Sequence, residues 1–310
     1  MNDLTPDEHG LEPPTTPPPA DDTPPVPWGW LRSVLFLIGY AVLTIVLAIV
    51  AVAAFGMLSG EEFHEIINTP SGALFTLVTL ATTVLVVWVF RIVVDGRSLL
   101  SLGLSFGKDE RRDALAGMYW GAGLTSTVFL ILLVSGQIDP GRVSFPVTGL
   151  LLQLATCAMV AATEELVTRG YLLHNLMQSA NKYLALLLVS ILFAVYHGFN
   201  PNVSWLGLLN IVLAGLMLGV YYVHRGNLWF PIGLHFTWNL FQGAVLGSSV
   251  SGLATPSILT FEPIGNELWT GGNFGFEASL VTTVVTVLAT AAIHIKYRCR
   301  PGGDRPGIAP

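Results

Sequence analysis

The stretch Val147–Gly170 reads VTGLLLQLATCAMVAATEELVTRG, and it joins a long apolar run to two adjacent acids and an arginine. A transmembrane helix needs about 20 mostly apolar residues, and this stretch supplies them up to Thr168. Acidic side chains inside a membrane span are costly, so they are found there for a structural or chemical reason. Glu164 and Glu165 therefore mark a membrane helix and, within it, the place where we expect the function of the chain to reside.

The composition of the whole chain agrees with a membrane protein. Its 310 residues are 52% hydrophobic and only 11% charged, and the mean hydropathy is +0.64. Soluble domains carry about 25% charged residues, so most of this chain is expected to be solvated by lipid. The net charge of −6 comes from acids in the N-terminal tail and a few loops. No basic patch predicts a nucleic-acid partner.

Eight segments are apolar enough to be transmembrane helices, which predicts an all-α polytopic membrane fold. They are Leu31–Leu58, Ala73–Val94, Ala114–Ser135, Val147–Thr168, Lys182–Phe199, Trp205–Val223, Leu228–Leu246 and Ala278–Tyr297. The fourth is expected to continue past Arg169 as a helix that emerges into the interface. The fifth is short for a span.

The distribution of Lys and Arg predicts the orientation, because cytoplasmic loops carry the excess of basic residues. Basic residues follow the second, fourth, sixth and eighth spans: Arg97, Lys108, Arg111, Arg112, Lys182, Arg225, Lys296, Arg298, Arg300 and Arg305. This alternation predicts that both termini are cytoplasmic, with Arg32 as a weak anchor of the first span. The segment from Ser248 to Glu277 contains acids but no basic residue.

The chain divides into three regions. Residues 1–27 form an acidic, Pro-rich tail that is predicted to be disordered, with docking of a proline motif as the alternative to a purely solvated tail. The tail lacks the basic start of a signal peptide. Residues 28–298 form the transmembrane helical domain, and residues 299–310 a short cytoplasmic tail. No internal repeat indicates a transporter built from inverted repeats.

Polar residues inside the membrane concentrate in the fourth to seventh predicted spans. They are Glu164, Glu165, Arg169, His197, Asn210, His235 and Asn239. A single His or Asn in a span is more often a hydrogen-bond partner of a neighbouring helix. Two carboxylates, an arginine and two histidines on neighbouring spans instead predict a buried site of the acid–base type.

Helical spacing separates the roles of the two glutamates. Glu165 and Arg169 are four residues apart with the acid first, which predicts an ion pair along one side of the helix. Glu164 is rotated by about 100° and has no cation three or four residues on. It is therefore available as a general base. The alternative is structural, with both acids joining helices through Arg169.

The other polar positions supply matching groups. His235 and Asn239 are also four residues apart, and their N–H groups are suitable donors to a developing oxyanion. His197 comes from another helix and could share a water with Glu164, whereas Phe193 is expected to pack beside the site. Counting residues along the helices places His197 deeper than Glu164 unless the fifth helix begins outside the hydrocarbon layer.

Other chemistries fit the sequence less well. Cys157 has no histidine near it in sequence, Ser190 has no GxSxG context, and HExxH is absent. Cys157 and Cys299 give neither a disulfide framework nor a CxxC metal site. Glu164, His197 and His235 are a chemically reasonable set of zinc ligands. Direct activation of water without a cofactor is the favoured interpretation, and zinc stays open as the alternative.

Three motifs carry a resemblance to a known family. They are EExxxR at Glu164–Arg169, FxxxH at Phe193–His197 and HxxxN at His235–Asn239. In this order, on successive spans, they resemble the CAAX protease and bacteriocin-processing family, which includes the CAAX endoproteases. Further segments resemble the family sequence at Gly215–Gly219, Leu228–His235 and Ser101–Leu104. The resemblance is strong over about residues 150–245 and elsewhere extends only to hydropathy.

The resemblance implies an intramembrane endopeptidase of eight helices. Glu164 would activate water together with His197, and His235 and Asn239 would stabilise the oxyanion. Glu165 and Arg169 would have supporting roles. Members are described either as metalloproteases or as metal-independent glutamate peptidases. The implied partners are the lipid bilayer and a membrane-associated peptide or protein substrate, and the expected location is a bacterial cytoplasmic membrane.

A noncatalytic membrane protein is the alternative function. A proton-coupled carrier also places Glu and His side chains in its spans, and a scaffold could reuse the fold. The paired donors His235 and Asn239 favour the peptidase, since a proton relay does not need them.

Overall fold

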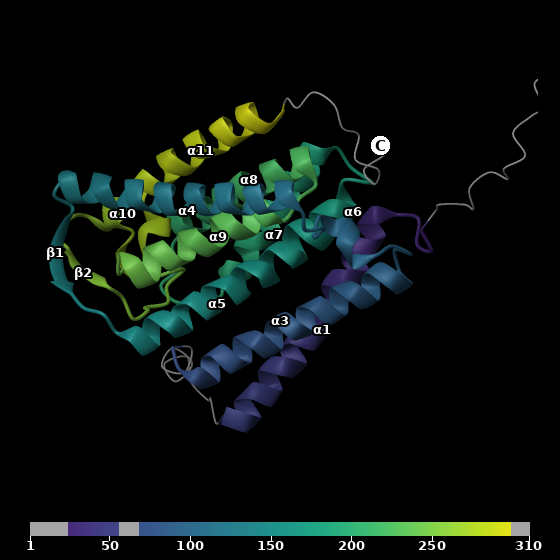
Figure 1. Cartoon of the computed structure of the whole chain (residues 1–310), viewed down its shortest axis with the longest axis horizontal. Helices are drawn as coiled ribbons and strands as arrows, with labels where there is room; N and C mark the ends of the chain where they lie inside the picture. The colour runs from purple at the N-terminus through teal and green to yellow at the C-terminus, as the bar shows by residue number, and fades with distance from the viewer. Residues whose placement is uncertain (1–23, 56–67, 299–310) are drawn as a thin grey trace, which may run out of the picture.

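A computed structural model describes residues 24–55 and 68–298 of the chain. The predicted C-terminal tail and almost all of the predicted N-terminal tail lie outside these residues, as do Cys299 and the predicted end of the first span. The long helices are α1 (Gly29–Phe55), α3 (Pro70–Val93), α4 (Lys108–Val134), α5 (Val147–Glu165), α7 (Lys182–His197), α8 (Trp205–Arg225), α9 (Trp229–Leu240) and α11 (Leu280–Arg298). They form an elongated bundle in which α1 and α3 make a separate pair beneath the others (Figure 1).

Six helices within the described residues are long and apolar enough to cross a membrane. They are α1, α3, α4, α8, α11 and the combined helix Val147–Leu176. The all-α polytopic prediction is confirmed, whereas the count of eight spans is not. The apolar helix α7 has 16 residues and rises about 24 Å, less than the roughly 30 Å of a hydrocarbon core. α9 has only 12 residues before its hydrogen bonding changes to a short π-helix, η3 (Phe241–Val245).

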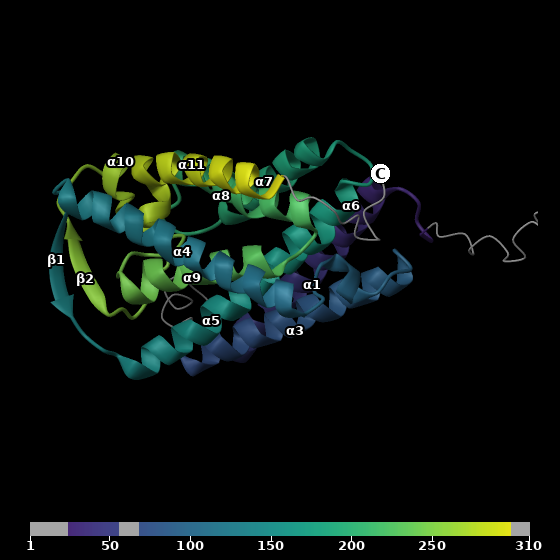
Figure 2. The ribbon, with the colours of Figure 1, turned by 45° about the horizontal axis from the view of Figure 1, so that its top comes forward.

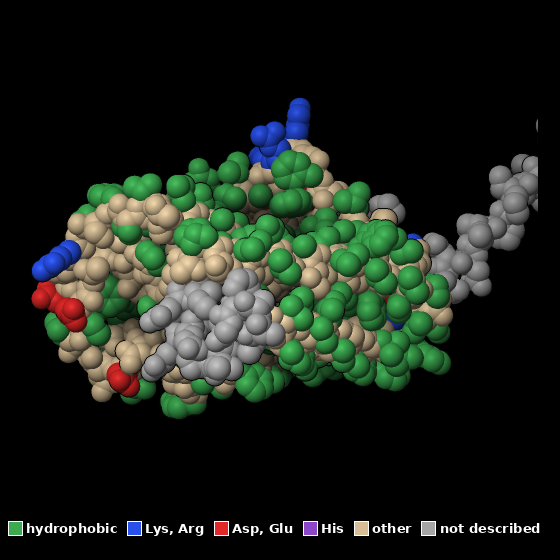
Figure 3. Space-filling view, turned by 90° about the horizontal axis from the view of Figure 1, so that it is seen from below, with side chains coloured by type: hydrophobic (Ala, Val, Ile, Leu, Met, Phe, Trp, Pro, Cys, Tyr) green, Lys and Arg blue, Asp and Glu red, His purple; other side chains and the backbone are tan. Residues whose placement is uncertain are grey.

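The surface supports a membrane location. Hydrophobic side chains cover most of the face formed by α1 and α3, and acidic side chains gather at the end with the β-strands (Figure 3). Ile38, Ile45 and Ile49 of α1 are each about 60% exposed. Exposed apolar side chains along a long helix are expected when lipid, rather than water, surrounds that surface.

The helix that begins with α5 continues as predicted. It passes into a π-helical segment, η2 (Leu166–Leu173), and then into a short α6 (His174–Leu176). Every residue from Glu165 to Asn175 is buried inside the protein, and the emergence of this part into the membrane interface stays a prediction. π-Helical segments are rare and occur frequently at functional sites. This one begins directly after the two glutamates.

Close packing of α4 on α9 fixes one wall of the bundle (Figure 2). A Cβ atom on Gly117 would lie 2.1 Å from the carbonyl oxygen of Phe230, and one on Gly121 would lie 2.2 Å from that of Leu234. Gly233 makes the reciprocal approach to Ala114 of α4. Small residues at a four-residue spacing let two helix backbones meet, as is common in membranes. The contact holds the part of α9 that carries His235.

The turn between α7 and α8 contacts residues 248–279, here called the closing loop. Asn200 Nδ2 donates to the carbonyl oxygen of Ser251 at 3.1 Å. Gly252, with φ +85°, approaches so closely that a Cβ atom would lie 2.0 Å from the carbonyl oxygen of Pro201. Asn210 of α8 donates to the carbonyl oxygens of Glu277 and Ser279 at 2.7 and 2.8 Å.

The closing loop also brings a strand and short helices. β1 (Ile138–Val143) pairs with β2 (Leu259–Pro263) in an antiparallel two-stranded sheet that closes one end of the molecule (Figure 1). The register joins Ile138 to Pro263, with an irregularity after Pro140. The remaining elements are η1 (Leu99–Leu102), α10 (Glu267–Thr270), η4 (Gly272–Phe274) and η5 (Phe276–Ala278).

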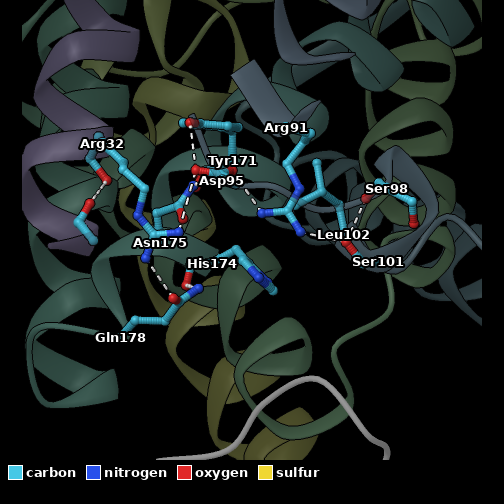
Figure 4. A network of polar contacts seen from close by, with 12 residues as sticks. Arg32, Arg91, Asp95, Ser98, Ser101, Leu102, Tyr171, His174, Asn175 and Gln178 are labelled. Carbon is cyan, nitrogen blue, oxygen red and sulfur yellow. Dashed lines mark hydrogen bonds and ion pairs between the residues drawn. The ribbon is translucent and has the colours of Figure 1, made fainter. Parts of the chain in front are cut away.

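A buried ionic network joins α1 and α3 to the end of η2 (Figure 4). Asp95 is fully buried and pairs with Arg91 at 2.8 Å and with Arg32 at 3.3 Å. The Tyr171 hydroxyl donates to the same carboxylate at 3.1 Å. Arg32, expected as a weak membrane anchor, is therefore an internal group that is 2% exposed. The network ties the separate pair of helices to the segment that follows the glutamates.

Candidate active site

Glu165 is the buried centre of the site's ionic contacts. It is fully buried, and its Oε1 accepts from Arg169 Nη1 at 2.9 Å and from His235 Nδ1 at 2.9 Å. Arg169 also donates to the carbonyl oxygen of Gly215 at 3.1 Å. The predicted pair of Glu165 and Arg169 is thus present. It extends to His235 on α9, a contact that spacing within one helix could not reveal.

Glu164 faces the two histidines. Its Oε2 lies 3.7 Å from His235 Nε2 and 3.9 Å from His197 Nε2, and its side chain is 20% exposed. This oxygen is buried, and it accepts no hydrogen bond from the residues that the structure describes. Counting residues had placed His197 deeper in the membrane than Glu164. In the structure α7 ends at His197, and its ring reaches Glu164.

The hydrogen bonds of each imidazole orient it toward Glu164. His197 Nδ1 lies 2.8 Å from the carbonyl oxygen of Phe193, which can only accept, so Nδ1 carries the proton. His235 Nδ1 likewise donates to the Glu165 carboxylate. Both rings therefore present Nε2 to Glu164. The proton on the second nitrogen fixes the tautomer, as it does in many catalytic histidines.

Phe193 packs against the two histidines and Arg169. Its ring centroid lies 4.5 Å from that of His197 and 6.3 Å from that of His235, the second in an edge-to-face arrangement. The guanidinium carbon of Arg169 lies 4.7 Å from the centroid of the same ring. Packing beside the site, which the sequence predicted for Phe193, is confirmed. The ring holds three polar groups in place without a polar atom of its own.

A cavity of about 610 Å³ connects these residues. Glu164, His197, His235 and Asn239 all line it, together with many apolar side chains from α1, α3, α5, α7, α8 and α9. Asn239 is 8% exposed and lies one turn after His235 on the same helix. The four residues predicted to carry the chemistry thus border one space. A cavity with few convergent polar groups is typical of small binding sites.

The alternative residues weighed from the sequence have other surroundings. Cys157 is buried in the cavity wall, and its Sγ lies 3.8 Å from Gln153. Ser190 donates to the carbonyl oxygen of Leu186 at 2.8 Å and packs against Gly215. Neither has the histidine partner that an activated nucleophile needs.

Glu164, His197 and His235, the zinc ligands considered from the sequence, all lie on the cavity wall. The two Nε2 atoms and Glu164 are the donor types that zinc takes. However, within residues 24–55 and 68–298 no group of three or more His, Cys, Asp or Glu side chains is placed so that it could hold a metal ion.

Glu277 lines the cavity and was not identified from the sequence as a site residue. Glu277 of η5 is 8% exposed, and its Oε2 accepts from the Ser251 backbone N–H at 2.5 Å and from Ser251 Oγ at 2.9 Å. Burial raises the pKa of this carboxyl, and the two hydrogen bonds oppose the shift. Asn210, predicted in the cluster, instead anchors the closing loop beside Glu277. The only sequence signal was an acid placed just before the last apolar run.

Comparison with known proteins agrees with the three motifs. Residues 146–241 match the family model described as type II CAAX prenyl endopeptidase Rce1-like. No curated protein and no solved structure matches the chain. The matched segment runs from the start of α5 into η3, and it contains all three motifs and both histidines. Residues 146–241 are thus similar to the CAAX protease and bacteriocin-processing family, and six helices among the described residues are long and apolar enough to span a membrane.

Proposed function

We propose that the chain is an intramembrane endopeptidase in which Glu164 and His197 activate a water molecule. The observation that carries the proposal is the convergence of Glu164 Oε2 with the Nε2 atoms of His197 and His235. Separations of 3.7 and 3.9 Å are too long for direct hydrogen bonds and suit bridging by one water.

In the first step, Glu164 takes a proton from this water as its oxygen attacks the carbonyl carbon of the substrate. His197 accepts a hydrogen bond from the same water through Nε2, because its Nδ1 proton is committed to Phe193. The tetrahedral intermediate collapses when the C–N bond breaks. Glu164 then returns the proton to the leaving nitrogen, which becomes an amine.

His235 and Asn239 stabilise the oxyanion in this scheme. The Asn239 amide donates an N–H, and His235 donates through Nε2 when that atom is protonated. Glu165 supports that state, since its negative charge contacts Nδ1 of the same ring at 2.9 Å. Glu165 and Arg169 act through His235 and are positioning residues. The paired donors are the part of the site that a proton relay would not use.

The cavity determines what can reach the site. Its apolar lining from α1 and α3 suits a peptide segment held in or at the bilayer, which we propose gains access from the cytoplasmic side. A bacterial cytoplasmic membrane is the proposed location. Glu164 and the two histidines supply a base and hydrogen-bonding groups for a water that enters the cavity.

The experiment compares cells that produce the wild-type chain with cells that produce Glu164→Gln, which keeps the side-chain shape but removes the base. Proteomics of protein termini should reveal new termini in membrane proteins only with the wild type. Identical termini in both strains would contradict the proposal.

Two further arms separate the alternatives. Purified protein in proteoliposomes should keep its activity in a strong zinc chelator, whereas loss that Zn²⁺ restores would establish a metallopeptidase. Transport of protons or solutes across the same vesicles without any cleavage would favour a carrier.

A further inference from the structure

The wall of the cavity carries acidic side chains but no lysine or arginine among the described residues. Among the same residues, Glu164 and Glu277 are the two carboxylates. His197 and His235 face Glu164, and Arg169 is engaged with Glu165 outside the lining. A cleft with one sign of charge and low-dielectric walls attracts groups of the opposite sign.

Glu277 is held rigidly at the wall formed by the closing loop. Both hydrogen bonds from Ser251 go to Oε2. Ser251 has φ +49°, a left-handed conformation that is uncommon for a residue other than glycine. Its N–H and hydroxyl can both reach the carboxylate in this conformation. Strained residues of this kind cluster at ligand-binding sites.

The second oxygen of Glu277 is the one left for a ligand. Oε1 takes part in no hydrogen bond or ion pair within the described residues, and the side chain borders the cavity. Asn210 fixes the backbone of Glu277 by its bond to the carbonyl oxygen. His197 and His235 are the nearby groups whose charge favours the ionised form of Glu277, and no lysine or arginine in the described part of the chain lies on the cavity wall. A cation brought by a ligand would therefore lower the cost of burying this carboxylate.

We propose that Glu277, positioned by Ser251, forms a subsite that accepts a Lys or Arg side chain of the substrate. The inference rests on the proposed peptidase function and adds a preference for a basic residue at a fixed distance from the scissile bond. The subsite lies outside the matched family segment, on a loop that sequence analysis left without a role. It is thus a feature of this chain's own closing loop.

The experiment uses full-length protein in detergent and a set of peptides with blocked termini. Each peptide carries a single lysine that moves one position at a time along an uncharged sequence, and each has a matched peptide with norleucine instead. The wild type should prefer lysine at one position by about 10- to 100-fold in kcat/KM, as expected for a charged hydrogen bond. Glu277→Gln should bring the lysine-to-norleucine ratio at that position close to one.

A control variant tests whether the effect is local. Glu262 of β2 is exposed, so Glu262→Gln makes the same chemical change at the surface and should keep the wild-type ratio. Because the wild-type comparison alone reveals the preference, the test does not depend on whether Glu277→Gln folds. An equal kcat/KM for lysine and norleucine at every position would overturn the subsite.

Binding distinguishes failure of the subsite from failure of the peptidase. The same peptides are titrated into Glu164→Gln and into the double variant that also carries Glu277→Gln. Tighter binding of a lysine peptide to the single variant only supports the subsite even if no cleavage is found. Equal affinities in all cases would overturn the subsite and leave the proposed reaction standing if cleavage is observed.

Discussion

Replacement of Glu165 by glutamine removes a charge from the most buried part of the site while keeping the side-chain shape. The carboxylate contacts Arg169 and His235 at 2.9 Å each and is fully buried. Without it, the guanidinium of Arg169, which is 1% exposed, keeps only neutral partners, Thr168 and Gly215. The substitution thus leaves a buried cation without the anion that it is hydrogen-bonded to.

The size of the effect follows from that loss. Removing one partner of a buried ion pair typically costs about 3–5 kcal/mol. Glutamine can still accept one hydrogen bond through its amide oxygen, so we expect a value near the lower end, about 3 kcal/mol. At roughly 2–4 °C per kcal/mol, the melting temperature should fall by about 6–12 °C.

The assay is thermal and denaturant unfolding of the purified protein in one detergent, with Glu164→Gln as the matched control. Glu164 is 20% exposed and makes no hydrogen bond through Oε2, so its substitution should shift the melting temperature by about 2 °C or less. Equal shifts for the two variants would refute the assignment of Glu165 as the structural acid.

Two further predictions concern the fold. Gly121→Ala should destabilise the protein by about 1–3 kcal/mol, because its new Cβ would meet the α9 backbone. Gly123→Ala should be neutral, because a Cβ there would have nothing within 4 Å, and equal unfolding curves for the two variants would contradict this prediction. Asp95→Asn should cost about 3–5 kcal/mol, since it leaves Arg32 and Arg91 without their carboxylate. The same change at exposed Asp139 should be nearly silent, and the reverse order in denaturant titration would refute the role of the network.

Features that depend on local periodicity could be predicted from the sequence. Six helices long enough to span a membrane agree with long apolar runs, and the pairing of Glu165 with Arg169 follows from their four-residue spacing. The convergence of His197 and His235 on Glu164 was anticipated from shared polarity in neighbouring spans.

Features that depend on distant partners could not be predicted. Arg32 and Asp95 are 63 residues apart, and Asn210 bonds to Glu277 across 67 residues. No spacing rule joins such positions. β1 contains Pro140 and Gly141, residues that are typical of turns, so its pairing with β2 had no alternating pattern to indicate it. The burial of η2 depends on contacts with other helices, such as the hydrogen bond from Arg169 to the carbonyl oxygen of Gly215 on α8, and spacing along one helix does not indicate them.

The central claim is that the adjacent glutamates have different functions. The most direct measurement is the rate of peptide cleavage by purified Glu164→Gln in proteoliposomes, together with its unfolding curve. The account predicts that cleavage is lost by a factor of about 100 or more while the unfolding curve stays close to that of the wild type. Cleavage at the wild-type rate by a folded Glu164→Gln protein would contradict it.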